Sequence, residues 1–163
     1  MRVQLTEEQI ERLRQTGVRL DADGRWWNEG QEVTHEGLRA AFWRWLDRLP
    51  DGRFVLRLDE RRYAYIAVDG APFVARSARW EGDRAFVRLS DGAEEELAYV
   101  TLRLTAGGVP YVKVRGGRFE ARLSTAAWGV VAQRLASRGG ATVLEAAGGP
   151  WPVASADSEA EPP

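Results

Sequence analysis

The sequence predicts an α+β fold in which a β-hairpin followed by a helix occurs twice around an antiparallel sheet. The first observation is a strand-turn-strand pattern with a Gly-Arg-aromatic turn, which occurs near residue 24 and again near residue 117. The second is that a helix-capping residue follows each hairpin, Thr34 in the first copy and Ser124 in the second. With these caps aligned, apolar residues fall on the same face of both helices. They are Leu38, Ala41, Phe42 and Trp45 in one helix and Trp128, Val131, Ala132 and Leu135 in the other.

Residues 1–17 predict a short amphipathic helix that precedes the first repeat. Thr6 is the expected N-cap, and Gln9 stands at the capping-box position three residues later. Gly17 is the expected stop signal. We therefore expect a separate N-terminal helix packed on the first repeat.

The two repeats are predicted to span residues 18–70 and 71–138. The first helix is expected to run from Thr34 to about Leu49, before the turn signal that starts at Pro50. Short apolar runs bounded by polar turns predict the strands between the two helices. These runs cover residues 53–58, 63–68, 73–80, 84–89 and 94–104. Such short connections favour an antiparallel meander over parallel strands joined by crossovers.

Residues 139–163 predict a mostly disordered, acidic tail after a Gly-Gly stop. From residue 148 onward, the segment has too few large apolar side chains to offset the entropy lost on ordering. Val143, Leu144 and Trp151 are the exceptions, and they either dock back onto the body or bind a partner.

Composition excludes several classes of protein and site. The chain has 163 residues, 44% hydrophobic and 29% charged, and it has no cysteine, which rules out disulfides, thiolate nucleophiles and cysteine zinc sites. No apolar run reaches the roughly 18 residues that span a bilayer, and the N-terminus lacks a secretory apolar core. A net charge of −1 is far from that of a dedicated nucleic-acid binder. We therefore expect a cytoplasmic protein without a nucleic-acid or membrane partner.

Few residues suggest chemistry. His35 is the single histidine, which excludes metal sites built from several histidines; it is either a surface residue at a helix start or a neutral imidazole that faces a ligand. Asp21 and Asp23 resemble the start of a calcium loop, but Gly24 comes too early, so a tight turn is the better interpretation. Trp26 and its neighbour form an aromatic pair of which one faces the core; the other is covered or serves as a stacking platform. The common hydrolase, NTPase and dinucleotide motifs are absent, so neither a catalytic residue, a metal nor a cofactor is predicted.

Two segments, VDGAPFV and PYVKVRGGRFEARL, resemble an uncharacterised bacterial family, domain-of-unknown-function family 1285. The resemblance covers roughly residues 18–137. It implies a duplicated α+β core, a C-terminal half superficially similar to pleckstrin-homology folds, and a ligand site between the halves for a nucleotide-like molecule in signalling. It brings no catalytic activity.

The same motifs carry the candidate ligand-binding residues. Tyr111, Arg115 and Arg122 match the C-terminal motif, and Asp69 and Phe73 match the central one. An arginine pair converging from neighbouring strands would suit a phosphate or carboxylate. The alternative is an arginine-carboxylate network with Asp69 that fastens the halves together.

The leading hypothesis is a non-enzymatic binding module that holds an anionic, nucleotide-like small molecule between the repeats. The alternative is a protein-protein interaction module that acts through a sheet edge or the C-terminal tail. An enzyme is the third class. The sequence identifies neither the ligand nor a protein partner.

Overall fold

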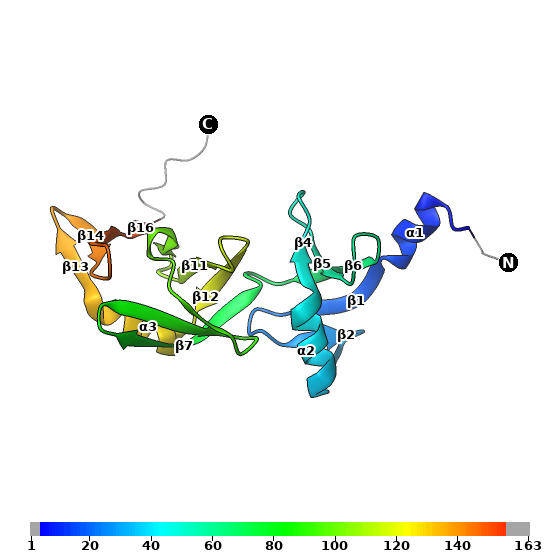
Figure 1. Cartoon of the computed structure of the whole chain (residues 1–163), viewed down its shortest axis with the longest axis horizontal. Coiled ribbons are helices and arrows are strands. Elements are labelled where there is room, and N and C mark those ends of the chain that lie inside the picture. Colours follow the sequence, from blue (N-terminus) through cyan, green and yellow to red (C-terminus); the bar gives the residue numbers. More distant parts are fainter. Residues whose placement is uncertain (1–3, 156–163) are drawn as a thin grey trace. The chain divides into compact units, whose positions relative to one another are not determined.

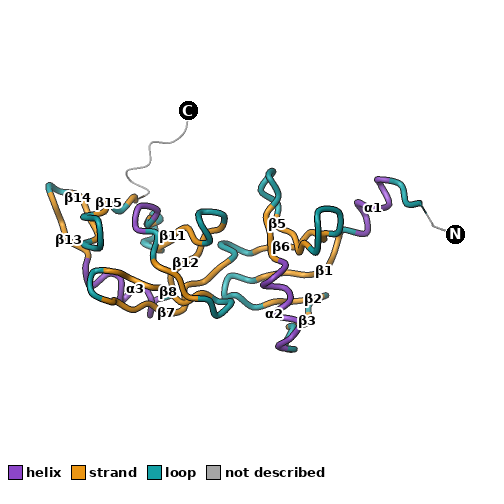
Figure 2. The backbone as a smooth tube through the Cα atoms, in the orientation of Figure 1, coloured by secondary structure: helices purple, strands orange, loops and turns teal. Residues whose placement is uncertain are grey.

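The chain forms two compact units, Met1–Gly70 (unit 1) and Ala71–Pro163 (unit 2). The structure, a computed structural model, describes residues 4–155. Both units are mixed α+β, with many short strands and few helices (Figure 2). Within the described residues, every helix is too short or too polar to cross a membrane. The predicted α+β class is therefore confirmed.

Unit 1 is built on a six-stranded sheet (Figure 1). Its elements are α1 (Glu7–Leu13), β1 (Gln15–Leu20), β2 (Trp26–Asn28), β3 (Gln31–Glu32), α2 (Glu36–Trp45), β4 (Leu46–Arg48), β5 (Phe54–Arg57) and β6 (Tyr63–Val68). The strand order is β3-β2-β1-β6-β5-β4. All neighbours are antiparallel except β1 and β6, whose ladder is parallel. The meander prediction misses this pair because its two strands are distant in sequence.

Helix α1 begins as predicted but ends earlier. The Thr6 hydroxyl accepts from the backbone N–H of Gln9, and the Gln9 side chain accepts from that of Thr6, which completes the capping box. The helix ends at Leu13, so Gly17 is not its stop signal. Gly17 lies inside β1 instead, where an added Cβ would collide with the Glu29 carboxylate. Because that carboxylate is the end of a flexible side chain, which can move aside, the contact does not by itself require glycine.

Helix α2 differs from its prediction at both ends. His35, not Thr34, is the N-cap, and its Nδ1 accepts from the backbone N–H of Leu38 at 3.1 Å. An imidazole nitrogen can act as an N-cap because, when it carries no proton, it accepts a hydrogen bond. The helix ends at Trp45, and the chain continues directly into β4, which pairs with β5 through Leu46 and Leu56. The predicted extension to residue 49 is therefore wrong.

The core of unit 1 lies between the sheet and α2. Trp26 is 1% exposed and packs edge-on against Phe42 and Trp43, with ring centroids 5.2 Å and 5.1 Å away. Its neighbour Trp27 points to the other side of β2, where its Nε1 donates to Asp21 at 2.8 Å. The expectation that one tryptophan of this pair faces the core is confirmed.

Unit 2 contains a seven-stranded sheet, one α-helix and a separate three-stranded sheet. Its elements are β7 (Phe73–Glu81), β8 (Arg84–Leu89), β9 (Glu94–Glu96), β10 (Arg103–Leu104), β11 (Pro110–Val114), β12 (Phe119–Leu123), α3 (Thr125–Val131), β13 (Leu135–Arg138), β14 (Ala141–Leu144), β15 (Trp151–Pro152) and β16 (Ala154–Ser155), with 3-10 helices at Tyr99–Thr101 and Ala132–Arg134. The order of the large sheet is β16-β10-β11-β12-β7-β8-β9. Two of its ladders are parallel, β12 with β7 and β10 with β16.

Helix α3 packs on β7 and is shorter than the repeat predicts. Ser124 caps it as expected, because its hydroxyl accepts from the backbone N–H of Ala127 at 3.1 Å. Ala127 and Val131 are completely buried. Across the interface, the Trp80 indole N–H donates to the Val130 carbonyl. After Val131 the chain tightens into a 3-10 turn and then enters β13, so Leu135 lies on a strand.

The prediction of disorder is wrong for residues 148–155. Trp151 lies in β15, its ring stacks on Tyr99 with centroids 5.9 Å apart, and its indole N–H donates to the Ala147 carbonyl at 2.9 Å. Val143 and Leu144 are buried in β14. One aromatic anchor and two aliphatic residues thus order a segment whose average composition is that of a disordered tail. The rest of the predicted tail, residues 156–163, lies outside the described residues.

The two hairpin-helix segments share a local order of elements but differ in how they join their sheets. In unit 1 the first strand of the hairpin, β1, pairs in parallel with β6, which follows the helix. In unit 2 the second strand, β12, pairs in parallel with β7, which precedes the hairpin. The predicted single sheet around both copies is therefore replaced by separate sheets with different connectivity.

We expect unit 2 to lose stability at both extremes of pH. Burial, followed by the hydrogen bond to Glu96, raises the pKa of Tyr99 from 10.0 to about 12. Hydrogen bonds from Arg84 and Tyr99 hold the pKa of Glu96 at about 2. The contribution of Tyr99 to the free energy of unfolding is present below pH 10 and is lost as the pH rises toward 12. The contribution of Glu96 is present above pH 4.5 and is lost as the pH falls toward 2.

The Tyr99→Phe variant tests this expectation. It leaves the buried Ala85 N–H without the acceptor that now lies 3.0 Å away, which costs about 1–3 kcal/mol at neutral pH. Thermal unfolding of the variant should also show a weaker fall in stability between pH 10 and pH 12. Tyr63→Phe, in unit 1, is the matched control and should keep the wild-type alkaline profile. Identical alkaline profiles for the wild type and Tyr99→Phe would contradict the assignment.

Candidate functional site

The β10–β12 part of the large sheet presents one polar face, which we call the hairpin face. Val112, Val114 and Ala121 point to the buried side and are at most 2% exposed. Side chains alternate along a strand, so the intervening residues point to the opposite side. The register pairs Tyr111 with Arg122, Lys113 with Glu120 and Arg103 with Tyr111. The hairpin face therefore consists of Arg103, Tyr111, Lys113, Glu120 and Arg122.

Positive charge exceeds negative charge on the hairpin face. The Arg103 guanidinium binds the Glu120 carboxylate through Nε at 3.1 Å and Nη2 at 2.8 Å. The same guanidinium lies over the Tyr111 ring, 4.7 Å from its centroid. Lys113 is exposed directly across from Glu120, and Arg122 lies across from Tyr111. Three cationic side chains therefore lie on the same face as one carboxylate and one aromatic ring.

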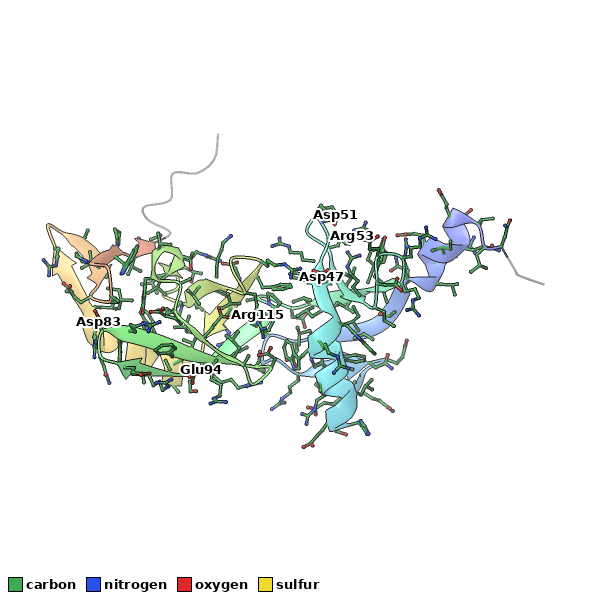
Figure 3. The ribbon with its side chains drawn as sticks, viewed as in Figure 1. Asp47, Asp51, Arg53, Asp83, Glu94 and Arg115 are labelled. Carbon is green, nitrogen blue, oxygen red and sulfur yellow. The ribbon has the colours of Figure 1, made fainter. Side chains whose placement is uncertain are left out.

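Arg115 lies at the end of the hairpin and is held by carboxylates of its own unit (Figure 3). It occupies the left-handed region at the β11–β12 turn, with φ 56°. Its guanidinium forms an ion pair with Asp91, and its Nε lies 3.9 Å from the Glu95 carboxylate. The guanidinium also lies over the Phe73 ring, 5.3 Å from the centroid. These partners stabilise the turn and bind the Arg115 guanidinium, which we expected to bind ligand.

The two predicted arginines are not paired across the hairpin. The residue opposite Arg122 is Tyr111, and Arg115 follows four residues later along the chain. At roughly 3.3 Å per residue, this offset separates the two backbone positions by about 13 Å along the strands. Sequence alternation gives the face on which a side chain lies, but only the register shows which residues lie opposite each other. Arg115 and Arg122 are therefore not cross-strand partners, and the convergence of their guanidinium groups on one anion stays a prediction.

Asp69 and Phe73 have structural roles within their own units. Asp69 follows β6 in unit 1, where it forms an ion pair with Arg19 and its N–H donates to the Leu20 carbonyl at 2.9 Å. Phe73 opens β7 in unit 2, is 3% exposed and packs edge-on against Phe119 at 5.5 Å. Such burial leaves its ring in the core rather than open for ligand stacking.

The other candidates from the sequence also have structural explanations. The Asp21 carboxylate accepts from the backbone N–H groups of Asp23 and Arg25, each at 2.9 Å, and from Trp27. Burial acts to raise the pKa of Asp21, but these hydrogen bonds outweigh it and lower the pKa. The turn interpretation is confirmed. Within residues 4–155, no group of three or more His, Asp or Glu side chains lies close enough to hold a metal ion.

Alternation predicts that Glu120 and Arg122 share one face of their strand, but the sequence does not indicate Arg103. The sequence predicts one strand over residues 94–104, whereas the structure has a 3-10 turn at Tyr99–Thr101. That turn redirects the chain so that Arg103 lies beside Tyr111 rather than on the β9 ladder. Glu120 itself was the available signal for a charged face, because it lies directly opposite Lys113.

Comparison with known proteins shows which fold this chain shares. No family model matches the sequence, and no curated protein matches it significantly. A solved DUF1285 family protein from Silicibacter pomeroyi DSS-3 is similar, with a TM-score of 0.73 and 23% identity, covering 88% of this chain and 82% of that chain. A second, from Shewanella baltica OS155, has a TM-score of 0.57 and 17% identity, covering 70% of this chain and 88% of that chain. Both solved proteins are less than 25% identical to this chain, so the comparison shows that the chain shares the fold of DUF1285 family proteins.

Proposed function

We propose that this chain is a non-enzymatic binding module that holds an anionic, nucleotide-like molecule on the hairpin face. The observation that carries the proposal is the cluster of three cations around one carboxylate and one tyrosine on adjacent strands. Lys113 and Arg122 supply donors for phosphate oxygens, and the Arg103 guanidinium plane stacked on Tyr111 supplies a platform for a planar base. Rigid strands position all of these groups.

Arginine and lysine contribute differently to such a site. The forked guanidinium of Arg122 suits bidentate contact with a phosphate, while Lys113 acts as a compact charge. Glu120 neutralises part of the positive charge and holds Arg103 in place. Arg115 is assigned to the turn, because Asp91 and Glu95 already surround its guanidinium.

Three broader proposals accompany this function. The hairpin followed by a capped helix in each unit supports an origin by duplication, and the strand-rich unit 2 with its packed helix supports a pleckstrin-homology-like C-terminal half. A cytoplasmic signalling role agrees with a nucleotide-like ligand. We keep the interaction-module alternative for the sheet edges alone, because Val143, Leu144 and Trp151 are engaged within unit 2.

Calorimetric titration tests the proposed site. We expect ADP and pyrophosphate to bind the wild type, and adenosine, which lacks phosphate, to bind more weakly. Lys113→Gln and Arg122→Gln should each weaken ADP binding by about tenfold or more, since a hydrogen bond to a charged group contributes about 1.5–3 kcal/mol. Arg122→Lys keeps the charge but loses the fork, so it should also weaken binding.

Arg88→Gln is the matched control, because Arg88 is an exposed arginine of the same sheet on β8. It should bind ADP like the wild type. Equal loss of affinity in Arg88→Gln would indicate nonspecific attraction to positive charge. Failure of every phosphate compound to bind the wild type would contradict the proposal.

A further inference from the structure

Unit 1 contains a shallow apolar cavity of about 350 Å³ that is largely open to solvent and does not involve the hairpin face. It lies between α1, the end of α2 and strands β5 and β6. Its apolar lining consists of Ile10, Leu13, Trp45, Leu56, Leu58 and Ala64. Pockets that hold small ligands measure roughly 300–1,000 Å³, so this volume is at the lower end of that range.

Two lining leucines are unusually exposed for their type. Leu13 is 69% exposed and lies at the end of α1, and Leu58 is 52% exposed and lies in the bend after β5. Helix α1 buries none of its residues, although Leu13 and Ile10 form one wall of the cavity. Covering apolar side chains of this size is favourable, at about 25 cal/mol per Å² of apolar surface removed from water. The cavity therefore offers binding energy to an apolar group.

All charged residues that line the cavity are arginines. The Arg14 guanidinium donates to the Arg61 carbonyl at 3.2 Å and lies over the Tyr63 ring, 3.9 Å from its centroid. Arg62 forms an ion pair with Asp59, at 2.6 Å between Nε and Oδ2. The exposed Arg61 side chain forms neither an ion pair nor a hydrogen bond with residues 4–155. Of the three, Arg61 thus has its guanidinium available for an anion.

The turn that carries Arg61 is fixed by Asp59. The Asp59 carboxylate accepts from the backbone N–H groups of Arg61 and Arg62, at 2.9 Å and 2.7 Å. Hydrogen bonds from the Arg62 side chain and from these two N–H groups hold the pKa of Asp59 at about 2. The ionised Asp59 carboxylate therefore fixes the turn that carries Arg61, one of the residues that line the cavity.

We propose that this cavity binds a free medium-chain monocarboxylate. The alkyl chain occupies the apolar hollow between α1 and strands β5 and β6, and the carboxylate accepts hydrogen bonds from Arg61 at the rim. The argument rests on charge complementarity, because an apolar hollow whose charged lining is entirely cationic favours a ligand with one apolar end and one anionic end. The site belongs to unit 1, so its failure would leave the proposal for unit 2 intact.

Calorimetric titration with decanoate, below its micelle concentration, tests this site. We expect decanoate to bind the wild type with one site, while acetate and decylammonium do not bind. Arg61→Gln should weaken decanoate binding by about tenfold or more. Leu13→Asn, at an exposed position that tolerates a polar side chain, should weaken it by a similar factor. Arg44→Gln is the control, because Arg44 is an exposed arginine of α2 that does not line the cavity.

Each contrary outcome overturns a defined part of the proposal. Equal binding of decanoate and decylammonium would show that the arginines do not select the head group. A loss of affinity in Arg44→Gln as large as that in Arg61→Gln would assign binding to the overall charge of unit 1. Failure of decanoate to bind the wild type would remove the site.

Discussion

Replacing Trp26 by alanine is expected to lower the free energy of unfolding of unit 1 by about 3–5 kcal/mol. The indole is 1% exposed and contacts both Phe42 and Trp43 edge-on. Its removal takes away the largest fully buried side chain of the described residues and leaves a cavity that the sheet and α2 cannot close. Urea denaturation followed by circular dichroism measures the loss.

Trp26→Phe separates packing from hydrogen bonding at the same position. The Trp26 Nε1 is buried without a hydrogen-bond partner, so phenylalanine loses packing but also removes an unsatisfied donor. We therefore expect a much smaller loss for Trp26→Phe than for Trp26→Ala. If the urea midpoint of unfolding is the same for Trp26→Ala and for the wild type, Trp26 is not the centre of the unit 1 core.

Replacing Trp151 by alanine is expected to lower the free energy of unfolding of unit 2 by about 2–3 kcal/mol. This loss is smaller than that for a fully buried tryptophan, because the Trp151 side chain is half-buried. The substitution removes the stacking on Tyr99 and the hydrogen bond to the Ala147 carbonyl. For a domain of this size we expect the unfolding midpoint to fall by about 5 °C or more. Differential scanning calorimetry measures the shift.

Val100→Ala is the control for the Trp151 experiment. Val100 follows Tyr99 directly but is 71% exposed, so its truncation should leave the midpoint almost unchanged. Deletion of residues 148–163 should lower the midpoint at least as much as Trp151→Ala, because it also removes β16 from the edge of the large sheet. A midpoint that stays constant on deletion would instead support the disordered tail that the sequence predicts.

The sequence predicts the local elements well because their signals are local. The Thr6 and Ser124 caps form as expected, since a hydroxyl and an N–H three residues later meet whenever a helix begins there. Both hairpins form for the same reason. The end of α2 is missed because Leu46 is drawn into pairing with Leu56, a tertiary contact that overrides helical periodicity.

The sequence predicts the candidate site only in part. Alternation predicts that Tyr111, Lys113 and Arg115 lie on one face. The structure agrees for Tyr111 and Lys113, but β11 ends at Val114 and Arg115 lies in the turn that follows. Alternation does not show that Arg103 lies on that face, because the 3-10 turn before it has no clear signal. Nor does it show that Asp91 and Glu95 hold Arg115, since these pairs join residues at least twenty positions apart.

The parallel ladders determine the order in which each unit can complete its fold. Arg19 pairs with Ala67 in unit 1, and Phe73 pairs with Ala121 in unit 2, so each ladder closes a loop of about fifty residues. The entropy of closing such loops must be offset before the pairing contributes, whereas the two hairpins form from neighbouring residues. Folding in each unit is therefore limited by a late, long-range step. Until that step, a newly synthesised chain presents the unpaired edges of β1 and β12 to other chains, which makes the interval before closure the time of greatest exposure to aggregation.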